Sequence, residues 1–327
     1  EAQLSAYGQI RGAVDTFQSR MTALQDIRRF TTLAPRAGNP EVLSATVGET
    51  AGRGSYQLEV LRVADNHRLA AGTAYASIDD TMAGSGDTMT VSVGDESFDI
   101  DIGGRSLGAI RTAINDAADN AGVTASIIKD DAGFRLMLVA DGTGSENAVS
   151  TSFSGADPFS LATINTDRDE SGGFTTADLD GVVVLEGQFT ATTSSNTVDD
   201  LIEGVTLTLN EAGTSTLTLD RDISSVKAQV TGFVDAYNQL QNTIAEVEDA
   251  SLRADASPLI TLGNQVASVL DEASEVGGAY RFLSELGISL ETDGTLGVDD
   301  RFLSRALETD FQGVARLFTD PVEGVAG

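Results

Sequence analysis

The chain has 327 residues, a formal net charge of −30, a hydrophobic fraction of 41% and no cysteine. This composition excludes disulfide bonds, a thiolate nucleophile and a cysteine-ligated zinc site. The charge disfavours nucleic acid and anionic membranes as partners, and no apolar run approaches the roughly 18 residues of a membrane-spanning helix. The length predicts two or three domains. Because the chain begins at Glu1 inside a helical pattern, we interpret it as a fragment trimmed at both ends.

The first predicted element is a helix over residues 4–33. Apolar side chains recur there at steps of three and four, which is the spacing of one helical face. Pro35 and Pro40 then end the pattern. Residues 1–36 carry five Arg against three acidic residues, so this segment is positively charged in an otherwise acidic chain. The apolar positions of this seam are Tyr7, Ile10, Val14, Phe17, Met21 and Leu24.

From residue 42 to about residue 220 the apolar pattern alternates, which predicts strands separated by Gly and Asp turns. The sequence GDES predicts a tight hairpin between strands 88–94 and 97–103. The sequence NEAG predicts a second hairpin, between strands 205–209 and 215–220. One helix interrupts the strands, beginning after Ser106 as N-cap and ending near Gly122. Further strands are expected at 56–64 and 134–140.

The helical pattern returns at residue 222, with helices expected at 223–248, 258–275, near 279–286 and at 299–318. The first of these carries an unbroken heptad seam, which must face a partner. Residues 222–327 are acidic and the first helix is basic, so we expect residues 4–33 to fold back against 223–247 as a coiled-coil-like pair. The apolar positions of this second seam are Ile223, Val226, Val230, Phe233, Tyr237, Leu240, Ile244 and Val247.

The sequence offers little material for catalysis. His67 is the single histidine, so a catalytic triad or a histidine–metal site would rest on one residue, and we expect a surface turn or a packing role for it. GGRSLG and GTGSEN lack the strand–loop–helix context of a phosphate-binding loop. No catalytic residue and no cofactor are predicted. Adjacent carboxylates are expected in solvated turns, at Asp79/Asp80, Asp130/Asp131, Asp199/Asp200 and Asp299/Asp300.

One acidic segment, DRDESGGFTTAD at 167–178, has the spacing of an EF-hand-type calcium loop. Asp167, Asp169 and Ser171 stand at its first, third and fifth positions, and Asp178 stands at its twelfth, where a bidentate Glu is usual. Helices on both sides are not evident. The segment is therefore either a weak calcium loop or an acidic glycine-rich turn, and no metal site is assigned.

Several segments together resemble one family. Residues 54–72, GSYQLEVLRVADNHRLAAG, resemble the N-terminal β segment of the bacterial flagellar filament-capping proteins, the hook-associated protein 2 family. Residues 87–148 resemble the flagellin IN module, with Ile114-Asn115 and Gly144 in the usual places. SSNTVDDLIEGVTLTL at 194–209 and VDAYNQL at 234–240 look like the most recognisable signatures of the family. Residues 286–318 are similar to its C-terminal helical region.

The resemblance implies a structural protein with no catalysis. Members of the family form an oligomeric ring at the filament tip, retain exported flagellin and promote its polymerisation. The implied location is extracellular, after export by the flagellar type III system. The implied partners are other copies of the chain and flagellin, with hook–filament junction proteins and an export chaperone through the family's terminal segments. Neither nucleic acid nor membrane insertion is expected.

The fold class expected from pattern and resemblance is α+β and multidomain. An antiparallel helical leg domain is predicted from residues 1–36 plus 222–327. A β-rich domain is predicted from 37–75 plus 175–221, and an inserted ββαββ head, the IN-like module, from 76–174.

Three alternatives stay open at this point. The chain is another axial flagellar component, such as a flagellin or a hook–filament junction protein, in which case the 194–240 signatures should be missing. It is a surface adhesin whose β domains, residues 40–221, bind a host glycan or mucin. Or it is an enzyme such as a glycosidase, which would need two convergent carboxylates that nothing in the sequence marks.

Overall fold

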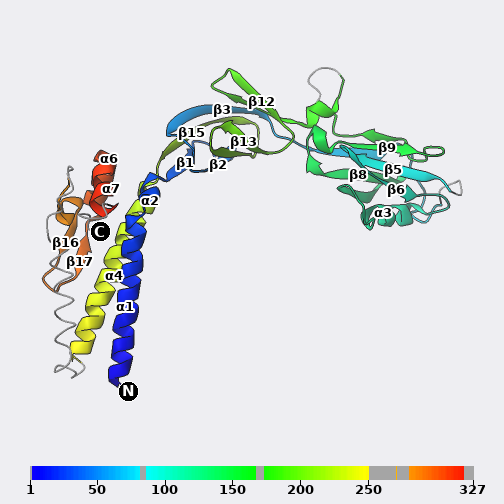
Figure 1. Ribbon diagram of the computed structural model, residues 1–327. Coiled ribbons are helices and arrows are strands. Elements are labelled where there is room, and N and C mark those ends of the chain that lie inside the picture. Colours follow the sequence, from blue (N-terminus) through cyan, green and yellow to red (C-terminus); the bar gives the residue numbers. More distant parts are fainter. Residues whose placement is uncertain (1, 82–85, 167–172, 250–269, 271–279, 320–327) are drawn as a thin grey trace. The chain divides into compact units, whose positions relative to one another are not determined.

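The computed structural model describes residues 2–81, 86–166, 173–249, 270 and 280–319 (Figure 1). The chain forms two compact units, one from Glu1–Ala34 with Asp220–Gly327 and one from Pro35–Leu219. Helices dominate the first unit and strands the second, so the protein is a multidomain chain of mixed helix and strand. No helix in the described ranges combines the length and the apolar character that crossing a membrane requires.

In the first unit, the predicted helix over 4–33 is two helices, α1 (Ala2–Gln25) and α2 (Ile27–Thr31). The break is at Asp26, whose backbone is extended (φ −76°, ψ 98°) and whose carboxylate accepts a hydrogen bond from the Arg28 backbone N–H at 3.1 Å. A short acidic side chain that satisfies a free N–H in this way starts a new helix. The apolar spacing continues through the break, which is why the pattern did not reveal it.

The second long helix, α4, spans Ile223–Asp249, close to the expected bounds. The helix expected at 299–318 is divided into α6 (Asp300–Thr309) and α7 (Phe311–Thr319), because Asp310 leaves the helical conformation and its carboxylate accepts from the Gly313 N–H at 2.9 Å. Near 279–286 there is one 3₁₀ turn, η4 (Leu283–Leu286), followed by the small hairpin of β16 (Ile288–Leu290) and β17 (Leu296–Val298). The predicted helix at 258–275 lies outside the described residues, Leu270 excepted.

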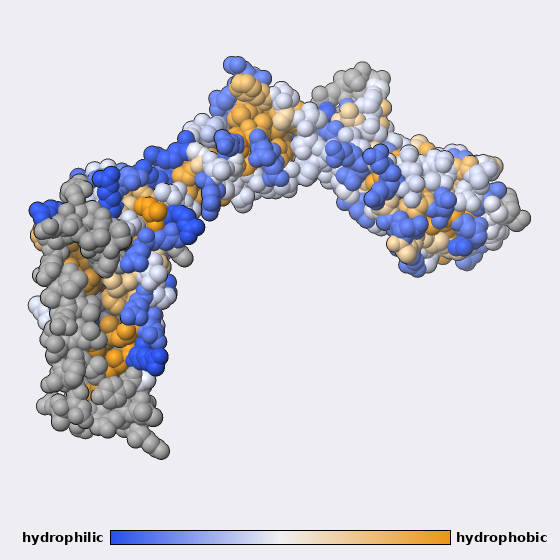
Figure 2. Space-filling model, in the orientation of Figure 1, coloured by the Kyte–Doolittle hydropathy of each residue, from blue (hydrophilic) through white to orange (hydrophobic). Residues whose placement is uncertain are grey.

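In the second unit, the strands within residues 33–62 and 181–221 form two sheets (Figure 1). The three-stranded sheet has the order β13 (Thr197–Ile202), β14 (Val205–Leu209), β2 (Leu43–Val47). Phe189 is exposed at the hairpin between β11 (Gly181–Leu185) and β12 (Phe189–Thr193), and Figure 2 shows hydrophobic residues at the surface over this hairpin. The five-stranded sheet has the order β1 (Leu33–Ala37), β15 (Gly213–Arg221), β3 (Gly54–Arg62), β11 (Gly181–Leu185), β12 (Phe189–Thr193).

The predicted hairpin at NEAG is wrong. β14 pairs with β13 and β2, whereas β15 pairs with β3, so the two segments lie in different sheets. Between them, the backbone N–H groups of Asn210 and Glu211 both donate to Val42 O, at 2.9 and 3.3 Å. This contact turns the chain away from β14. A short polar link with glycine suits a hairpin and a change of sheet equally well, and the long-range contact with Val42 selects the second.

The remaining strands of this unit form two sheets with helix α3 (Leu107–Asn115). Their apolar side chains, among them Met89, Phe98, Ile110 and Leu138, share one buried cluster. The first sheet has the order β10 (Leu161–Thr163), β4 (Asn66–Ala71), β8 (Gly133–Thr143), β7 (Val123–Asp130), and the second the order β6 (Glu96–Asp101), β5 (Thr88–Val93), β9 (Val149–Phe153).

Strand β4 differs from the sequence expectation in its sheet partners. The boundary drawn from the sequence placed residues 66–71 with 37–75, but β4 pairs with β8 and β10. Its buried residues Leu69 and Ala71 belong to the apolar cluster of the IN-like segment. The alternating pattern of residues 54–72 continues without a break, so it gave no sign that the chain changes sheets after Arg62.

Two local predictions are confirmed in this segment. β5 and β6 form the hairpin expected at GDES, with Val93 opposite Glu96. The Ser106 hydroxyl caps α3 by accepting from the Ala109 N–H at 3.2 Å. The helix ends at Asn115, however, not near Gly122. Asn115 is the last helical residue, and its side chain holds the helix end to β7 by exchanging two hydrogen bonds with the Ala125 backbone, at 2.7 and 2.9 Å.

Candidate functional site: the paired leg helices

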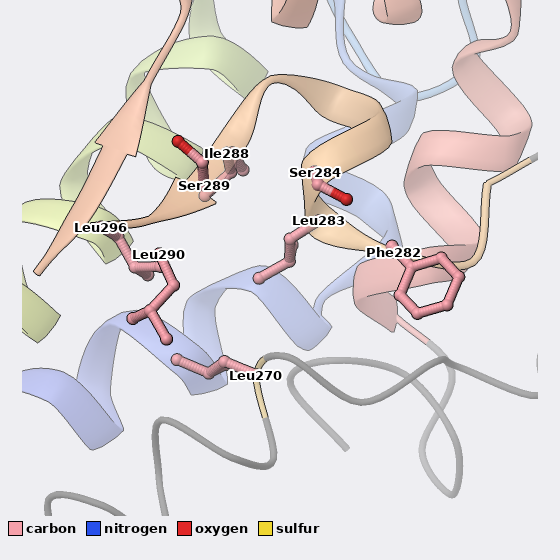
Figure 3. A pocket seen from close by; sticks show the side chains of 8 residues that line it. All are labelled: Leu270, Phe282, Leu283, Ser284, Ile288, Ser289, Leu290 and Leu296. Atoms are coloured by element: carbon pink, nitrogen blue, oxygen red, sulfur yellow. The ribbon is translucent and has the colours of Figure 1, made fainter. Parts of the chain in front are cut away.

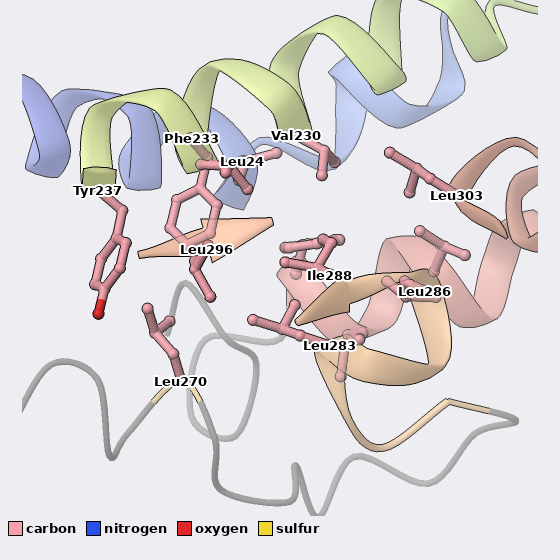
Figure 4. Packing of buried hydrophobic residues seen from close by; sticks show 14 of the residues in the cluster. Leu24, Val230, Phe233, Tyr237, Leu270, Leu283, Leu286, Ile288, Leu296 and Leu303 are labelled. Carbon is pink, nitrogen blue, oxygen red and sulfur yellow. The ribbon is translucent and has the colours of Figure 1, made fainter. Parts of the chain in front are cut away.

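The paired leg helices α1 and α4 lie side by side and share one buried apolar cluster (Figure 1). The Phe17 ring on α1 is 5.5 Å from the Phe233 ring and 6.0 Å from the Tyr237 ring on α4. Leu24 packs with Val230 farther along the same contact (Figure 4). Side chains from the two predicted seams therefore meet at the centre of this helix pair.

The individual seam positions differ in how deeply they are buried. Val14, Met21 and Ile223 are half-buried at the margin of the cluster. Ile10 and Val247 are buried but lie outside the shared cluster, and the side chain of Tyr7 is outside the described part of the structure. The buried seam residues that share the cluster are Phe17, Leu24, Val226, Val230, Phe233, Tyr237, Leu240 and Ile244.

Helix α4 also packs against the C-terminal elements, and the heptad analysis missed this second contact. Val234 and Ala236 lie off the seam, yet both are buried in the same cluster. Figure 4 shows where side chains from η4, β16, β17 and α6 approach α4. Alanine and valine beside a heptad seam give only a weak signal for a second buried face. The C-terminal members of the cluster are Leu270, Leu283, Leu286, Ile288, Leu296, Leu303, Ala306, Leu307, Phe311, Val314, Ala315, Leu317 and Phe318.

The segment VDAYNQL at 234–240 connects α4 to the β16–β17 hairpin by polar contacts. The Asn238 side chain accepts from the Leu296 N–H at 2.7 Å and donates to Leu296 O at 2.9 Å. The Tyr237 hydroxyl donates to Gly294 O at 3.1 Å and receives a hydrogen bond from the Gln241 amide at 2.7 Å. Burial raises the pKa of the Tyr237 phenol, so the hydroxyl keeps its proton. These hydrogen bonds hold the β16–β17 hairpin on the face of α4, which gives the segment 234–240 a structural role.

Aromatic contacts fix α2 against α7. The Phe30 ring lies 6.4 Å from the rings of both Phe311 and Phe318. The Arg221 guanidinium lies over the Phe311 ring, 4.6 Å from its centroid. Lys227 of α4 meets Asp300 of α6 at 3.1 Å. The first unit is thus assembled from segments that lie far apart in the sequence.

An apolar hollow lies beside the β16–β17 hairpin (Figure 3). Its lining offers leucine, isoleucine and phenylalanine side chains and two hydroxyls, so the lining residues supply no group for proton transfer or metal binding. The lining residues are Leu270, Phe282, Leu283, Ser284, Ile288, Ser289, Leu290 and Leu296.

His67, the one candidate for histidine chemistry, is buried in β4 and is only 3% exposed. Its Nδ1 accepts from the Val149 N–H at 2.9 Å, so Nε2 carries the proton and donates to Thr163 Oγ1 at 2.9 Å. Its ring stacks on Phe174, with the centroids 6.1 Å apart. Burial lowers the pKa of His67. The expected packing role is confirmed, while a position in a surface turn is not, because the imidazole joins β4, β9 and β10 inside the fold.

The calcium-loop prediction remains untested, because Asp167, Asp169 and Ser171 lie outside the described residues. Asp178 is described, and its carboxylate accepts from both the N–H and the hydroxyl of Thr175, at 2.7 and 3.1 Å. In the described part of the chain, no three His, Asp or Glu side chains gather in a way that could hold a metal ion.

The adjacent carboxylates serve backbone turns where their contacts are described. Asp80 accepts from the Ser77 N–H at 2.9 Å, and Asp299 caps α6 by accepting from the Arg301 N–H at 2.9 Å. Asp130 accepts from the Arg135 guanidinium at 2.7 Å, and this hydrogen bond is the main reason why its pKa lies below the ordinary value. These contacts account for the carboxylates without acid–base chemistry.

Comparison with known families agrees with this architecture. The model of the flagellar hook-associated protein 2 N-terminus matches residues 1–67, that of the flagellin hook IN motif matches 88–142, and that of the flagellar hook-associated protein 2 C-terminus matches 179–326. The crystal structure of the flagellar cap protein FliD D1-D2-D3 domains from Escherichia coli aligns with a TM-score of 0.72 at 29% identity, covering 99% of this chain and 93% of that one.

Curated relatives match over nearly the whole chain. The B-type flagellar hook-associated protein 2 of Pseudomonas aeruginosa is 34% identical over 347 residues, covering 97% of this chain and 72% of the relative. The flagellar hook-associated protein 2 of Escherichia coli strain K12 is 30% identical with the same coverage of both chains. These matches show that the protein belongs to the flagellar hook-associated protein 2 family.

Proposed function

We propose that this protein caps the distal tip of the bacterial flagellar filament. In this role copies of the chain form an oligomeric ring that retains exported flagellin and promotes its polymerisation. The observation that carries the proposal is the match to a flagellar cap protein structure over 99% of this chain. Its partners are other copies of itself and flagellin, and it acts as a structural protein without catalysis, outside the cell, after export by the flagellar type III system.

The proposed division of labour follows the domains. The leg, predicted as residues 1–36 plus 222–327, corresponds to the unit Glu1–Ala34 with Asp220–Gly327, and it presents the coiled-coil-like helix pair as a rigid support. Two β-rich domains are inserted between α1 and α4. The pairing of β4 with β8 supports a head domain that begins near residue 66, with the other β-rich domain formed by the remaining strands of residues 37–65 and 175–221.

The direct test is a deletion of the gene in the source bacterium. We expect loss of swimming together with unpolymerised flagellin in the medium, because a filament without a cap cannot retain its exported subunits. The full-length gene should restore both. Normal filaments and swimming would reject the cap function and favour the adhesin alternative, whereas lost filaments without leaked flagellin would indicate a junction or other axial component.

A pair of variants in the full-length gene sharpens this test. Phe233 is fully buried between the leg helices, whereas Phe302 of α6 is 60% exposed. Phe233→Asp should fail to restore swimming, because it places a charge in the leg core. Phe302→Asp, the matched control, should restore it if the fold of the leg is what the cap requires. Immunoblots of the exported protein separate failure of capping from failure of export.

A further inference from the structure

The second unit contains a polar junction between its two pairs of sheets. The chain leaves the five-stranded sheet at the end of β3, passes through residues 63–65 into β4, and returns at Asp180 into β11. A third segment, Ser194–Asn196 between β12 and β13, lies against both crossings. We call residues 62–66, 142–147, 178–181 and 194–196 the junction.

The carboxylate of Asp180 lies at the centre of the junction. Asp180 is only 7% exposed. Its Oδ1 accepts from the Ser145 N–H at 2.6 Å and from the Ser194 hydroxyl at 3.1 Å, and its Oδ2 accepts from the Ser145 hydroxyl at 2.8 Å. A buried carboxylate is costly unless donors surround it. Here the donors come from two other chain segments, so the carboxylate joins three segments through its hydrogen bonds.

The two crossings are bound to each other as well. The Asn196 side chain accepts from the Ala64 N–H at 2.7 Å and donates to Ala64 O at 3.0 Å. The Asp65 N–H donates to Leu179 O at 2.9 Å, and Asp65 O accepts from the Gly144 N–H at 2.9 Å. Linkers between independently moving domains have few such contacts. These crossings instead have their backbone groups satisfied across the junction.

Close packing at Gly144 adds a steric restriction. Its backbone has φ +78°, and a Cβ at this position would lie 2.3 Å from the Cα of Ser194. The Thr143 hydroxyl also donates to Ser194 O at 2.8 Å. Gly144 therefore lies directly against Ser194, with no space for a side chain between the two residues.

We propose that Asp180 locks the two β-rich parts of residues 35–219 in one orientation, so that they move as a single rigid body. This device is independent of the cap proposal, since it concerns only contacts within the chain. Removing the carboxylate leaves the Ser145 N–H and two hydroxyls without their acceptor, and water then enters the junction. The expected consequence is motion between the two parts while each retains its own apolar core.

The test uses spin labels, because the chain has no cysteine of its own. Cysteines replace two exposed residues, Ser97 on β6 and Thr190 on β12, in the full 327-residue chain. Pulsed electron–electron double resonance should give one narrow distribution of the distance between the two labels. In Asp180→Ala we expect the width of this distribution to increase about twofold or more. A second label pair within one part, at Thr190 and Thr208, should keep its width.

The control variant is Asp157→Ala. Asp157 also accepts from backbone N–H groups in a turn, at Phe159 and Ser160, but it lies outside the junction. It should leave the Ser97–Thr190 distribution unchanged. If Asp180→Ala does not fold, the measurement is made on Asp180→Asn and Ser194→Ala, where we expect smaller but measurable broadening. A folded Asp180 variant whose distribution is as narrow as that of the parent chain overturns the proposal, and broadening in Asp157→Ala does so as well.

Discussion

The leg and the junction are held together by different kinds of contact. In the leg, Phe17, Phe233 and their neighbours bury apolar surface between two long helices. In the junction, Asp180, Asn196 and Asp65 bind backbone groups of distant segments. Apolar burial has no preferred direction, whereas a hydrogen bond to a buried carboxylate depends on distance and angle. The chain therefore uses a periodic apolar interface, which the sequence reveals, for support, and a set of single polar residues for orientation.

The largest effect should come from a charge in the leg core. Phe233→Asp places an unpaired carboxylate at a fully buried position against the Phe17 ring. We expect the leg to unfold or to lose several kcal/mol, about 3–5, of unfolding free energy. Circular dichroism with denaturant titration measures this loss. Phe302→Asp is the matched control and should change stability little, and a Phe233→Asp protein with a cooperative, near-normal transition would show that the described packing is wrong.

A smaller loss is expected where the leg uses a polar contact like those of the junction. Asn238→Ala removes both hydrogen bonds to the Leu296 backbone. The unfolding free energy should fall by about 2–3 kcal/mol, because an N–H and a C=O lose their partners. Hydrogen exchange at Leu296 should also accelerate.

Gln239→Ala, at the exposed neighbouring position, is the control for Asn238→Ala and should stay close to the parent chain. Equal stability of the two alanine variants would mean that the β16–β17 hairpin does not depend on Asn238.

His67 makes the β-rich unit sensitive to acid. Its folded pKa is lowered by burial, and Nδ1 must stay unprotonated to accept from Val149. The unfolded chain therefore binds the proton more readily. The stabilisation is complete above the unfolded value of about 6.5 and is lost as pH falls toward the folded pKa. We expect a slope of at most about 1.4 kcal/mol per pH unit between pH 6.5 and 5.

The slope is measured by denaturant unfolding at several pH values, with a signal that reports the unfolding of the second unit, Pro35–Leu219. His67→Gln removes the titrating group, so its stability should depend less on pH over the same interval, whatever its stability at pH 8. Parallel pH profiles of the two proteins would assign the acid sensitivity to the carboxylates instead.

The smallest effect should come from the surface ion pair of the leg. Lys227 meets Asp300 at 3.1 Å, but the Asp300 side chain is 71% exposed. Lys227→Met should lower stability by less than about 1 kcal/mol, and the difference should shrink further in high salt. A loss as large as that of Asn238→Ala would show that this ion pair does more than a solvated surface pair.

Local sequence was sufficient where one residue and its near neighbours decide the structure. The apolar steps of α1 and α4 marked the faces that meet, because a helix with one apolar stripe must bury it. Ser106 marked the start of α3, and the two-residue turn after Val93 marked the β5–β6 hairpin. The breaks at Asp26 and Asp310 were missed, because the apolar spacing runs through both and only the side-chain hydrogen bonds of each Asp reveal them.

Tertiary structure decided which strands pair and which polar residues matter. β14 and β15 each have the alternation of a half-buried strand, and alternation tells which face is buried but not which strand lies alongside. β14 and β15 lie in different sheets because the chain between them is bound to Val42 O, 168 positions before Asn210 in the sequence. Asp180 is one acidic residue among 50 Asp and Glu. Only the fold surrounds it with Ser145 and Ser194, because a hydrogen bond to a buried carboxylate depends on positions in space and leaves no period in the sequence.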